Sequence, residues 1–436
     1  MQKDQIVVGL DIGTTKICAM VGRLNEHGRL EILAVGKAPS EGVIRGQIAN
    51  LEKTKQGIEK AIKEASDLAD VDIKVVKVGI SGHNIRSSQT ESFIVRENKD
   101  VEINWNDVER LTQDIHRTVM PAGFQLIHAM PQSFTLDGEV GITNPIGHSG
   151  VKLGAKYHLV MAETEVVNKI HKCVKGSNLF ANELILEPIA SSLAVLTNEE
   201  KDQGVALVDI GGGTTDLAIY ENGILVYSSV IPYGGNIITN DIKQGCVLMQ
   251  AQAEQLKTRF GYALTEEADE NTIVSLKGLR GRPPKEISVK QLSYIIQSRM
   301  EEIIEFILAE IHHAGHLNKI PAGIVLTGGG AKLNGLSSLF QVCSGMDVRI
   351  GYPNEYLGKS KFEDAKNPIY STVIGLMLAG FHTIDERFKE HHLPEESEVK
   401  TVIDNGSPIS AIWDRFKRQT TTFLQEDINS GTDFKN

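Results

Sequence analysis

The sequence lacks the features that mark several classes of protein. Its four cysteines, Cys18, Cys173, Cys246 and Cys343, lie far apart and form no Cys-x-x-Cys pair, so we expect buried thiols in a reducing compartment rather than disulfides or a metal site. No apolar run approaches the roughly 18 residues that cross a bilayer. Met-Gln-Lys-Asp-Gln leads directly into a strand, so we expect no signal peptide. The pattern Gly-x-x-x-x-Gly-Lys-Ser/Thr is missing too, which leaves a P-loop mechanism unsupported.

The chain also lacks a surplus of positive charge. Its 45 Lys and Arg stand against 56 Asp and Glu, and the net charge of −11 argues against a general nucleic-acid binder, although a local basic patch is still allowed. The 436 residues, 41% of them hydrophobic, leave room for two or more domains with separate cores. We therefore expect a cytoplasmic, multi-domain globular protein without a nucleic-acid partner.

Two stretches of the chain, 6–21 and 205–220, are versions of one another. In each, an apolar run ending near an Asp is followed by a turn rich in Gly and Thr and by a second apolar run, which is the pattern of strand, turn and strand. The residues concerned are Asp11, Gly13, Thr14, Thr15 and Lys16 in the first stretch, and Asp209, Gly211, Gly212, Gly213, Thr214 and Thr215 in the second. Glycines let the backbone approach an anion, toward which N–H and hydroxyl groups can point. One such hairpin could be an ordinary β-turn, but two suggest a nucleotide phosphate chain held between two related domains.

Hydrophobic spacing predicts the other elements. Helices are expected at 51–69, 104–119, 163–179, 237–249, 250–260, 289–315 and 370–381. A strand should lead into a helix at 183–196, and 324–336 has the pattern of strand, glycine turn and helix. Residues 84–165 mix isolated strands with one helix, which indicates a small α+β insertion. The polar stretch 265–288 indicates a loop, and beyond about 383 the composition is that of a linker.

Five segments occur in the order typical of the actin/Hsp70/sugar-kinase ATPase fold. Residues 11–16, 187–196, 209–216, 327–336 and 370–380 resemble phosphate 1, connect 1, phosphate 2, the adenosine motif and connect 2 of that superfamily. Within it, residues 80–87, 234–242 and 253–257 resemble the FtsA family of bacterial cell-division proteins, in which a 1C subdomain replaces the usual 1B. The resemblance runs from end to end. It implies an α/β fold of two related RNase H-like domains around a nucleotide cleft.

The same resemblance divides the chain into subdomains. Subdomain 1A takes 1–83 and 166–198, 1C takes 84–165, 2A takes 199–231 and 312–385, and 2B takes 232–311. A flexible linker at 386–408 and an amphipathic helix at 409–425 complete the chain.

The resemblance and the chemistry of the residues together imply a site for ATP and Mg²⁺. Lys16 could reach the phosphates, and Asp11 and Asp209 could each hold a water of a hydrated Mg²⁺, an ion that keeps most of its waters. Glu187 would position the attacking water, unless it is only a carboxylate favoured by a helix N-terminus. The implied nucleotide set also includes Gly235, Asn236, Glu254, Lys257, Gly328, Gly329, Gly330 and Lys332. The alternatives are a simple helix-entry turn at 328–330 and an exposed ion pair at 254 and 257.

The end of the chain predicts a helix that lies on a membrane. At 100° per residue, one face of about 120° gathers Ile409, Ile412, Trp413, Phe416, Phe423 and Leu424. Arg415 and Lys417 flank this face and Arg418 lies opposite, as in an interfacial helix whose long basic side chains reach the headgroups. The alternative is a helix docked on its own protein or on a partner. The threonines at 420–422 and the acidic pair at 426–427 make the expected anchor a weak one.

By resemblance, the protein would be an actin-like polymer that tethers FtsZ filaments to the inner face of the cytoplasmic membrane at the division septum. It would hydrolyse ATP slowly and contact other division proteins through 1C. Asn236, Lys290 and Arg299 would bind the acidic C-terminal peptide of FtsZ, although Lys290 and Arg299 could equally be solvated helix charges. Two other functions fit the fold: a sugar or acetate kinase, for which no second-substrate motif is found, and an Hsp70-like chaperone, for which too few residues follow 383.

Overall fold

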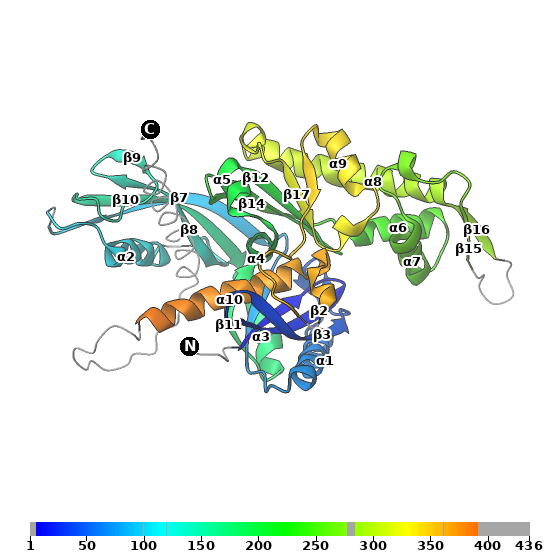
Figure 1. Ribbon diagram of the computed structural model, residues 1–436, viewed down its shortest axis with the longest axis horizontal. Coiled ribbons are helices and arrows are strands. Elements are labelled where there is room, and N and C mark those ends of the chain that lie inside the picture. Colours follow the sequence, from blue (N-terminus) through cyan, green and yellow to red (C-terminus); the bar gives the residue numbers. More distant parts are fainter. Residues whose placement is uncertain (1–5, 99, 119, 277–283, 361, 391–436) are drawn as a thin grey trace, which may run out of the picture.

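Two five-stranded sheets with the same strand order form the centre of the molecule (Figure 1). The computed structural model describes residues 6–98, 100–118, 120–276, 284–360 and 362–390. The first sheet has the order β11-β6-β1-β2-β3 and comprises β1 (Ile6–Ile12), β2 (Lys16–Leu24), β3 (Leu30–Pro39), β6 (Val75–Ile80) and β11 (Phe180–Leu186). The second has the order β14-β13-β12-β17-β18 and comprises β12 (Val205–Ile210), β13 (Thr215–Glu221), β14 (Ile224–Ile231), β17 (Ile324–Thr327) and β18 (Val348–Ile350). In each sheet three antiparallel strands are followed by two parallel ones. The two halves therefore share one topology, as the paired hairpins predicted.

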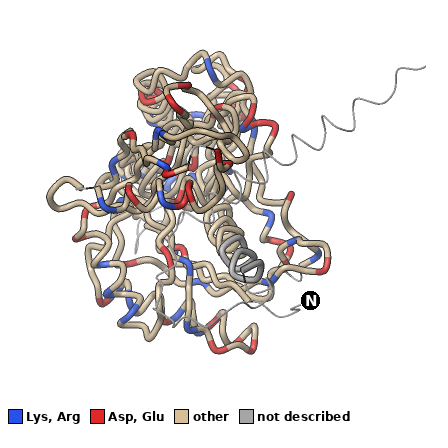
Figure 2. Tube along the Cα trace, turned by 90° about the vertical axis from the view of Figure 1, so that its left-hand side faces the viewer, with Lys and Arg blue, Asp and Glu red and all other residues tan. Residues whose placement is uncertain are grey.

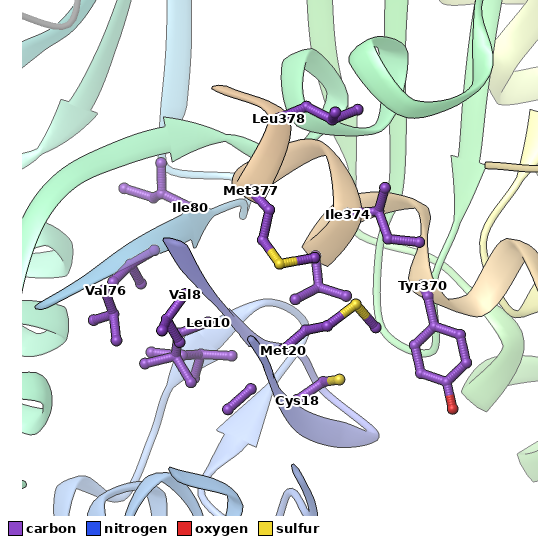
Figure 3. Close-up of a cluster of buried hydrophobic side chains, with 14 of the residues drawn as sticks. Val8, Leu10, Cys18, Met20, Val76, Ile80, Tyr370, Ile374, Met377 and Leu378 are labelled. Carbon is purple, nitrogen blue, oxygen red and sulfur yellow. The ribbon is translucent and has the colours of Figure 1, made fainter. Parts of the chain in front are cut away.

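Two helices connect the halves. α4 (Glu187–Val195) contacts strands of both sheets, and α10 (Ser371–Glu390) packs on α4 and on β1, β2 and β6. Figure 3 shows the side chains of α10 meeting those of β1, β2 and β6 in one buried cluster. Although 312–385 was predicted to belong to 2A, α10 thus packs with the first sheet. It also continues to Glu390, past the expected end at 381.

The remaining helices of the first half cover the other side of its sheet. α1 (Leu51–Ala69) packs on β2 and β3, and α3 (Thr164–Gly176) lies beside it. α1 begins where Asn50 Oδ1 accepts a hydrogen bond from the Lys53 N–H at 3.0 Å. The short elements β4 (Val43–Ile44) and β5 (Gln47–Ile48) precede α1, and α5 (Asn198–Gln203) leads into the second sheet.

Residues 85–163 form the predicted α+β insertion. Its antiparallel sheet has the order β7-β10-β8-β9, comprising β7 (Ile85–Val95), β8 (Phe124–Leu136), β9 (Glu139–Ile142) and β10 (Lys152–Glu163). α2 (Trp105–His116) packs against this sheet around its own apolar core. Asn104 and Asp107 make a capping box at the start of α2, which confirms the predicted cap. Seen from the end of the insertion, acidic and basic residues are interspersed along the trace (Figure 2).

A helical unit lies beyond the second sheet. It contains α6 (Gly235–Gly245), α7 (Gln250–Phe260) and α8 (Val289–His313), with α9 (Leu336–Ser344) packed against α8. The expected loop at 265–288 is partly wrong, because β15 (Ile273–Leu276) and β16 (Lys285–Ser288) pair as antiparallel strands. α6 begins two residues earlier than expected, because the N–H groups of Gly235 and Asn236 donate to Gly211 O and Gly212 O.

Among the helices within the described ranges, none has the length and hydrophobicity that crossing a bilayer requires. The predicted amphipathic helix at 409–425 and its residues lie outside the described part of the chain, as does the linker from 391 onward.

Candidate functional site

The two glycine turns meet between the two sheets. The turn after β1 carries Thr14 and Thr15, and the turn after β12 carries Gly212 and Gly213. A Cβ added at Gly212 would lie 1.9 Å from Thr15 Oγ1, and one added at Gly213 would lie 2.5 Å from Thr14 Oγ1. Only glycine allows the turns to come this close. The structure thus brings together the two segments that were predicted to hold phosphates.

The threonine hydroxyls of the turns differ in what they can reach. Thr215 is fully buried and donates to Tyr233 O at 2.8 Å, and Thr214 donates to Asp216 Oδ2 at 3.3 Å. Thr14 Oγ1 accepts from the Gly46 N–H at 2.9 Å, whereas Thr15 is exposed. The hydroxyls of Thr214 and Thr215 therefore stabilise the hairpin, and Thr15 is the threonine best placed to meet a ligand.

Four acidic residues gather below the turns: the buried Asp11, Asp209 and Asp216 and the half-buried Glu187. Asp209 Oδ2 accepts from Ser191 Oγ at 2.5 Å and from Thr372 Oγ1 at 3.2 Å. Asp216 Oδ1 accepts from Ser81 Oγ at 2.5 Å. Strands from both sheets and both connecting helices therefore contribute to one acidic cluster.

Burial and mutual repulsion weaken the acidity of these groups. Burial raises the pKa of Asp11 to about 6, with Lys16 opposing the shift and Asp209 adding to it. Burial and the adjacent Asp209 raise the pKa of Asp216 to about 7. Burial, followed by the charges of Asp11, Asp216 and Asp209, raises the pKa of Glu187 well above its ordinary range. The cluster therefore holds protons near neutral pH, and a bound cation would favour their release.

Lys16 points toward the connecting helix α10. Its Nζ donates to Ile369 O at 2.5 Å and lies 4.5 Å from the centre of the Tyr370 ring. The ammonium also lowers the pKa of Asp11, so its charge acts on the acidic cluster. Lys16 thus stands at the edge of the predicted phosphate site, held by residues that the sequence did not single out.

The helical unit supplies several of the predicted nucleotide residues to the second turn. Asn236 lies at the start of α6, where its N–H donates to Gly212 O at 2.8 Å. Lys257 Nζ donates to Gly235 O at 2.9 Å and pairs with Glu254 Oε2 at 2.8 Å. Glu254 and Lys257 thus form the ion pair that was the alternative prediction. Because Lys257 also bonds to Gly235 O, the pair fixes α7 beside the second turn.

The third glycine segment follows β17. Gly328 has a φ of +83° and packs so closely that an added Cβ would lie 2.2 Å from Asp209 Oδ1. Gly329 and Gly330 follow, and Lys332 is exposed at the end of the same short turn. The predicted adenosine segment therefore adjoins the acidic cluster.

The residues predicted to bind a peptide do not form one set. Lys290 pairs with Glu270, while Arg299 donates to Asp241 Oδ2 at 2.5 Å and also pairs with Glu302. Asn236 lies instead at the phosphate turn. Both cations are already engaged with acidic neighbours.

Sequence reasoning missed Asp216, Ser191 and Thr372. Asp216 had a usable signal, because the register of the β12–β13 hairpin places it directly across from Asp209. Ser191 and Thr372 lie far apart in the chain, and only the crossing of α4 and α10 brings them to one carboxylate.

Comparison with known families agrees with this geometry. A family model described as cell division protein FtsA matches residues 206–375, and one described as the SHS2 domain inserted in FtsA matches residues 82–161. The FtsA of Pseudomonas aeruginosa is 38% identical over 380 residues, which cover 87% of this chain and 90% of that protein. The chain belongs to the FtsA family. The matched SHS2 range nearly coincides with the predicted 1C subdomain at 84–165.

Solved structures show that this FtsA-family chain has an actin-like ATPase fold. The PilM–PilN type IV pilus biogenesis complex matches with a TM-score of 0.63 at 18% identity, over 86% of this chain and 98% of that one. MreB5 of Spiroplasma citri bound to ADP matches with a TM-score of 0.52 at 16% identity, over 89% of this chain and 99% of that one. At such identities these matches support the fold and nothing finer.

Proposed function

We propose that this FtsA-family protein binds ATP with Mg²⁺ between its two glycine turns and works in cell division as an actin-like polymer. It tethers FtsZ filaments to the inner face of the cytoplasmic membrane at the septum and helps to recruit later division proteins through 1C. The observation that carries the proposal is the meeting of the turns at Thr15 and Gly212, above carboxylates from both halves of the molecule.

The turns suit a polyphosphate. The Gly211 N–H closes the second turn by donating to Thr214 O, while Gly212 and Gly213 have no side chains of their own to keep a phosphate from the backbone. Thr15 and Lys16 add a hydroxyl and a positive charge. Gly328, Gly329 and Gly330 provide a flat surface for the base, while Asn236, Glu254 and Lys257 adjoin from the helical unit. MreB5, which shares the fold, has been solved with ADP.

The acidic cluster suits a hydrated Mg²⁺. The described residues contain no group of three or more His, Cys, Asp or Glu side chains arranged to ligate a metal directly. Magnesium retains several waters, so Asp11 and Asp209 would hold it through those waters. When bound, the ion would supply positive charge that offsets the repulsion among the carboxylates.

Hydrolysis should be slow. Glu187 would position the attacking water, but burial and the neighbouring Asp11, Asp216 and Asp209 raise its pKa well above the ordinary range and so disfavour its ionised form. A protonated carboxyl group donates a hydrogen bond and accepts no proton, so it is a poor general base. A polymer adaptor needs a nucleotide state more than it needs turnover, and this chemistry fits that requirement.

The attachments at the two ends of the adaptor follow from charge and amphipathicity. The apolar face from Ile409 to Leu424 would lie in the headgroup region of an anionic membrane, and polymerisation would add avidity to one weak anchor. An acidic FtsZ peptide would have to displace Asp241 or Glu270 from Arg299 or Lys290. Such an exchange of partners predicts modest, salt-sensitive affinity.

The proposal is tested by electron microscopy of the full chain with ATP and Mg²⁺ on an anionic lipid monolayer. We expect filaments on the lipid, and none on the lipid when residues 409–436 are removed. The truncated protein should still bind ATP, which separates anchoring from folding. Unchanged lipid binding after truncation would refute the anchor, and rapid phosphorylation of a small metabolite would refute the adaptor in favour of a kinase.

A further inference from the structure

The start of α10 and the two residues before it contact three segments of the candidate nucleotide site. Ile369 and Tyr370, just before the helix, contact Lys16 of the first turn. Ser371 Oγ lies 2.7 Å from Thr327 Oγ1, at the end of the strand that leads into the third glycine segment. Thr372 Oγ1 donates to Asp209 Oδ2 at 3.2 Å. Four consecutive residues thus reach three segments that are remote in sequence.

Tyr370 makes the least expected of these contacts. The residue is 1% exposed, and its ring lies under two ammonium groups, with Lys16 Nζ 4.5 Å and Lys37 Nζ 4.7 Å from the ring centre. Phe362 meets the ring edge-on, with a centroid distance of 5.6 Å, and also lies 5.1 Å from Lys37 Nζ. The buried Tyr370 therefore packs at the centre of a cation–aromatic cluster whose other members are half-buried.

We propose that Tyr370 is a positioning residue that holds the Lys16 ammonium at the edge of the phosphate site, so that nucleotide affinity depends on the π face of its ring. This inference rests on the proposed binding of ATP. It adds a residue outside the glycine turns and ties phosphate recognition to the segment that leads into α10.

The donors of Lys16 explain how this arrangement would work. An ammonium has three N–H donors, and the Ile369 carbonyl accepts one of them. The ring attracts the charge without accepting a conventional hydrogen bond, so donors remain for phosphate oxygens. A long lysine side chain otherwise loses considerable rotamer freedom when it binds, and fixing it beforehand lowers that cost.

The neighbouring contacts tie the start of α10 to other parts of the candidate nucleotide site. The Thr327 hydroxyl donates to Gly351 O at 3.1 Å, so it can accept from Ser371. Ile369 accepts from Lys16, and the adjoining Ser371 and Thr372 contact Thr327 of β17 and Asp209, so one short segment joins these parts of the site. Tyr370 thus links the first turn to the other half of the site.

The test replaces Tyr370 by Phe and by fluorinated phenylalanines, which keep the ring shape and progressively weaken its negative face. Calorimetric titration of the full chain with Mg²⁺-ATP should give an affinity for Tyr370→Phe within about twofold of the wild type, and a stepwise loss on the order of tenfold along the fluorinated series. The same series is repeated in a Lys16→Met background, where the steps should vanish. Lys37→Met, which removes the other cation over the ring, is the matched control and should leave ATP affinity nearly unchanged.

The outcomes distinguish failure of the proposed role of Tyr370 from failure of the proposed ATP binding. An ATP affinity that stays constant along the fluorinated series, or that falls equally in the Lys16→Met background, would overturn the role of Tyr370 while leaving ATP binding intact. Failure of the wild-type protein to bind ATP would overturn the proposed function and this inference together. Circular dichroism of every variant shows whether it is folded, and the isosteric series avoids the cavity that Tyr370→Leu would create.

Discussion

The crossing of α4 and α10 should depend on one glycine. A Cβ added at Gly375 would lie 1.7 Å from Ala190 O and 2.3 Å from the carbonyl carbon of Ala190. These distances fall roughly 1.5–2 Å short of ordinary van der Waals contact. Both partners are helical backbone, so no rotamer change can relieve the clash, and the helices themselves must separate.

The magnitude follows from two opposing terms. Replacing Gly by Ala inside a helix favours folding by up to about 1 kcal/mol. Overpacking a core costs about 1–3 kcal/mol, and more where backbone must move. We therefore expect Gly375→Ala to lower the free energy of unfolding by about 2 kcal/mol or more. ATP affinity should fall as well, because Ser191 and Thr372 on these helices hold Asp209.

Urea unfolding followed by circular dichroism, together with ATP titration, measures both effects. Gly176→Ala is the matched control, since Gly176 is an exposed helical residue whose added Cβ would meet only the Lys55 side chain, at 3.4 Å. The control should be neutral or slightly stabilising. If Gly375→Ala unfolds at the same urea concentration as the control and binds ATP normally, the close contact of α4 and α10 does not exist in solution.

Two further variants probe buried titratable side chains, His158 and Asp209. Burial lowers the pKa of His158 to about 4, so the folded state resists protonation and loses stability as pH falls from about 6.5 toward 4. His158→Gln should remove about 3 kcal/mol of this pH dependence in urea unfolding. An equal pH dependence of unfolding in the variant and the wild type would refute the argument. Asp209→Asn should weaken Mg²⁺-ATP binding at least tenfold. It should not destabilise the unliganded protein, because the substitution removes a charge that repels Asp11 and Asp216. The exposed Asp72→Asn is its control, and an unchanged ATP affinity of Asp209→Asn would exclude Asp209 from the site.

The parts of the fold that depend on local chemistry could be predicted from the sequence. The hairpins at Asp11 and Asp209 formed as expected, because apolar runs on either side of a short glycine turn fix pairing between neighbours in the chain. The cap at Asn104 was predictable for the same reason. The repeated hairpin even indicated the duplication of the two sheets.

The parts of the fold that depend on contacts remote in sequence could not be predicted in this way. β15 and β16 are only four residues each, and they lie in a stretch that is polar as a whole. The helical spacing of α10 indicated a buried helix but not which sheet would bury it. Lys16 was expected at the phosphates from its place in the turn. Nothing in the sequence indicated that Ile369 and Tyr370, which lie more than 350 positions later in the chain, would hold its ammonium group.

The acidic cluster has a consequence for how the two halves move. Asp11 comes from the first sheet, Asp209 and Asp216 from the second, and Glu187 from a connecting helix. Their raised pKa values mean that ionising them in the folded protein costs free energy, so their repulsion grows as pH rises through about 6 to 7. Charges on opposite halves relieve this repulsion by moving apart, whereas a shared cation relieves it by drawing them together. Ligand charge would therefore favour closure of the halves around α4 and α10. The insertion would feel this closure from both sides, because Ser87 and Gln132 donate to β14 while His128 accepts from the Leu186 N–H of β11.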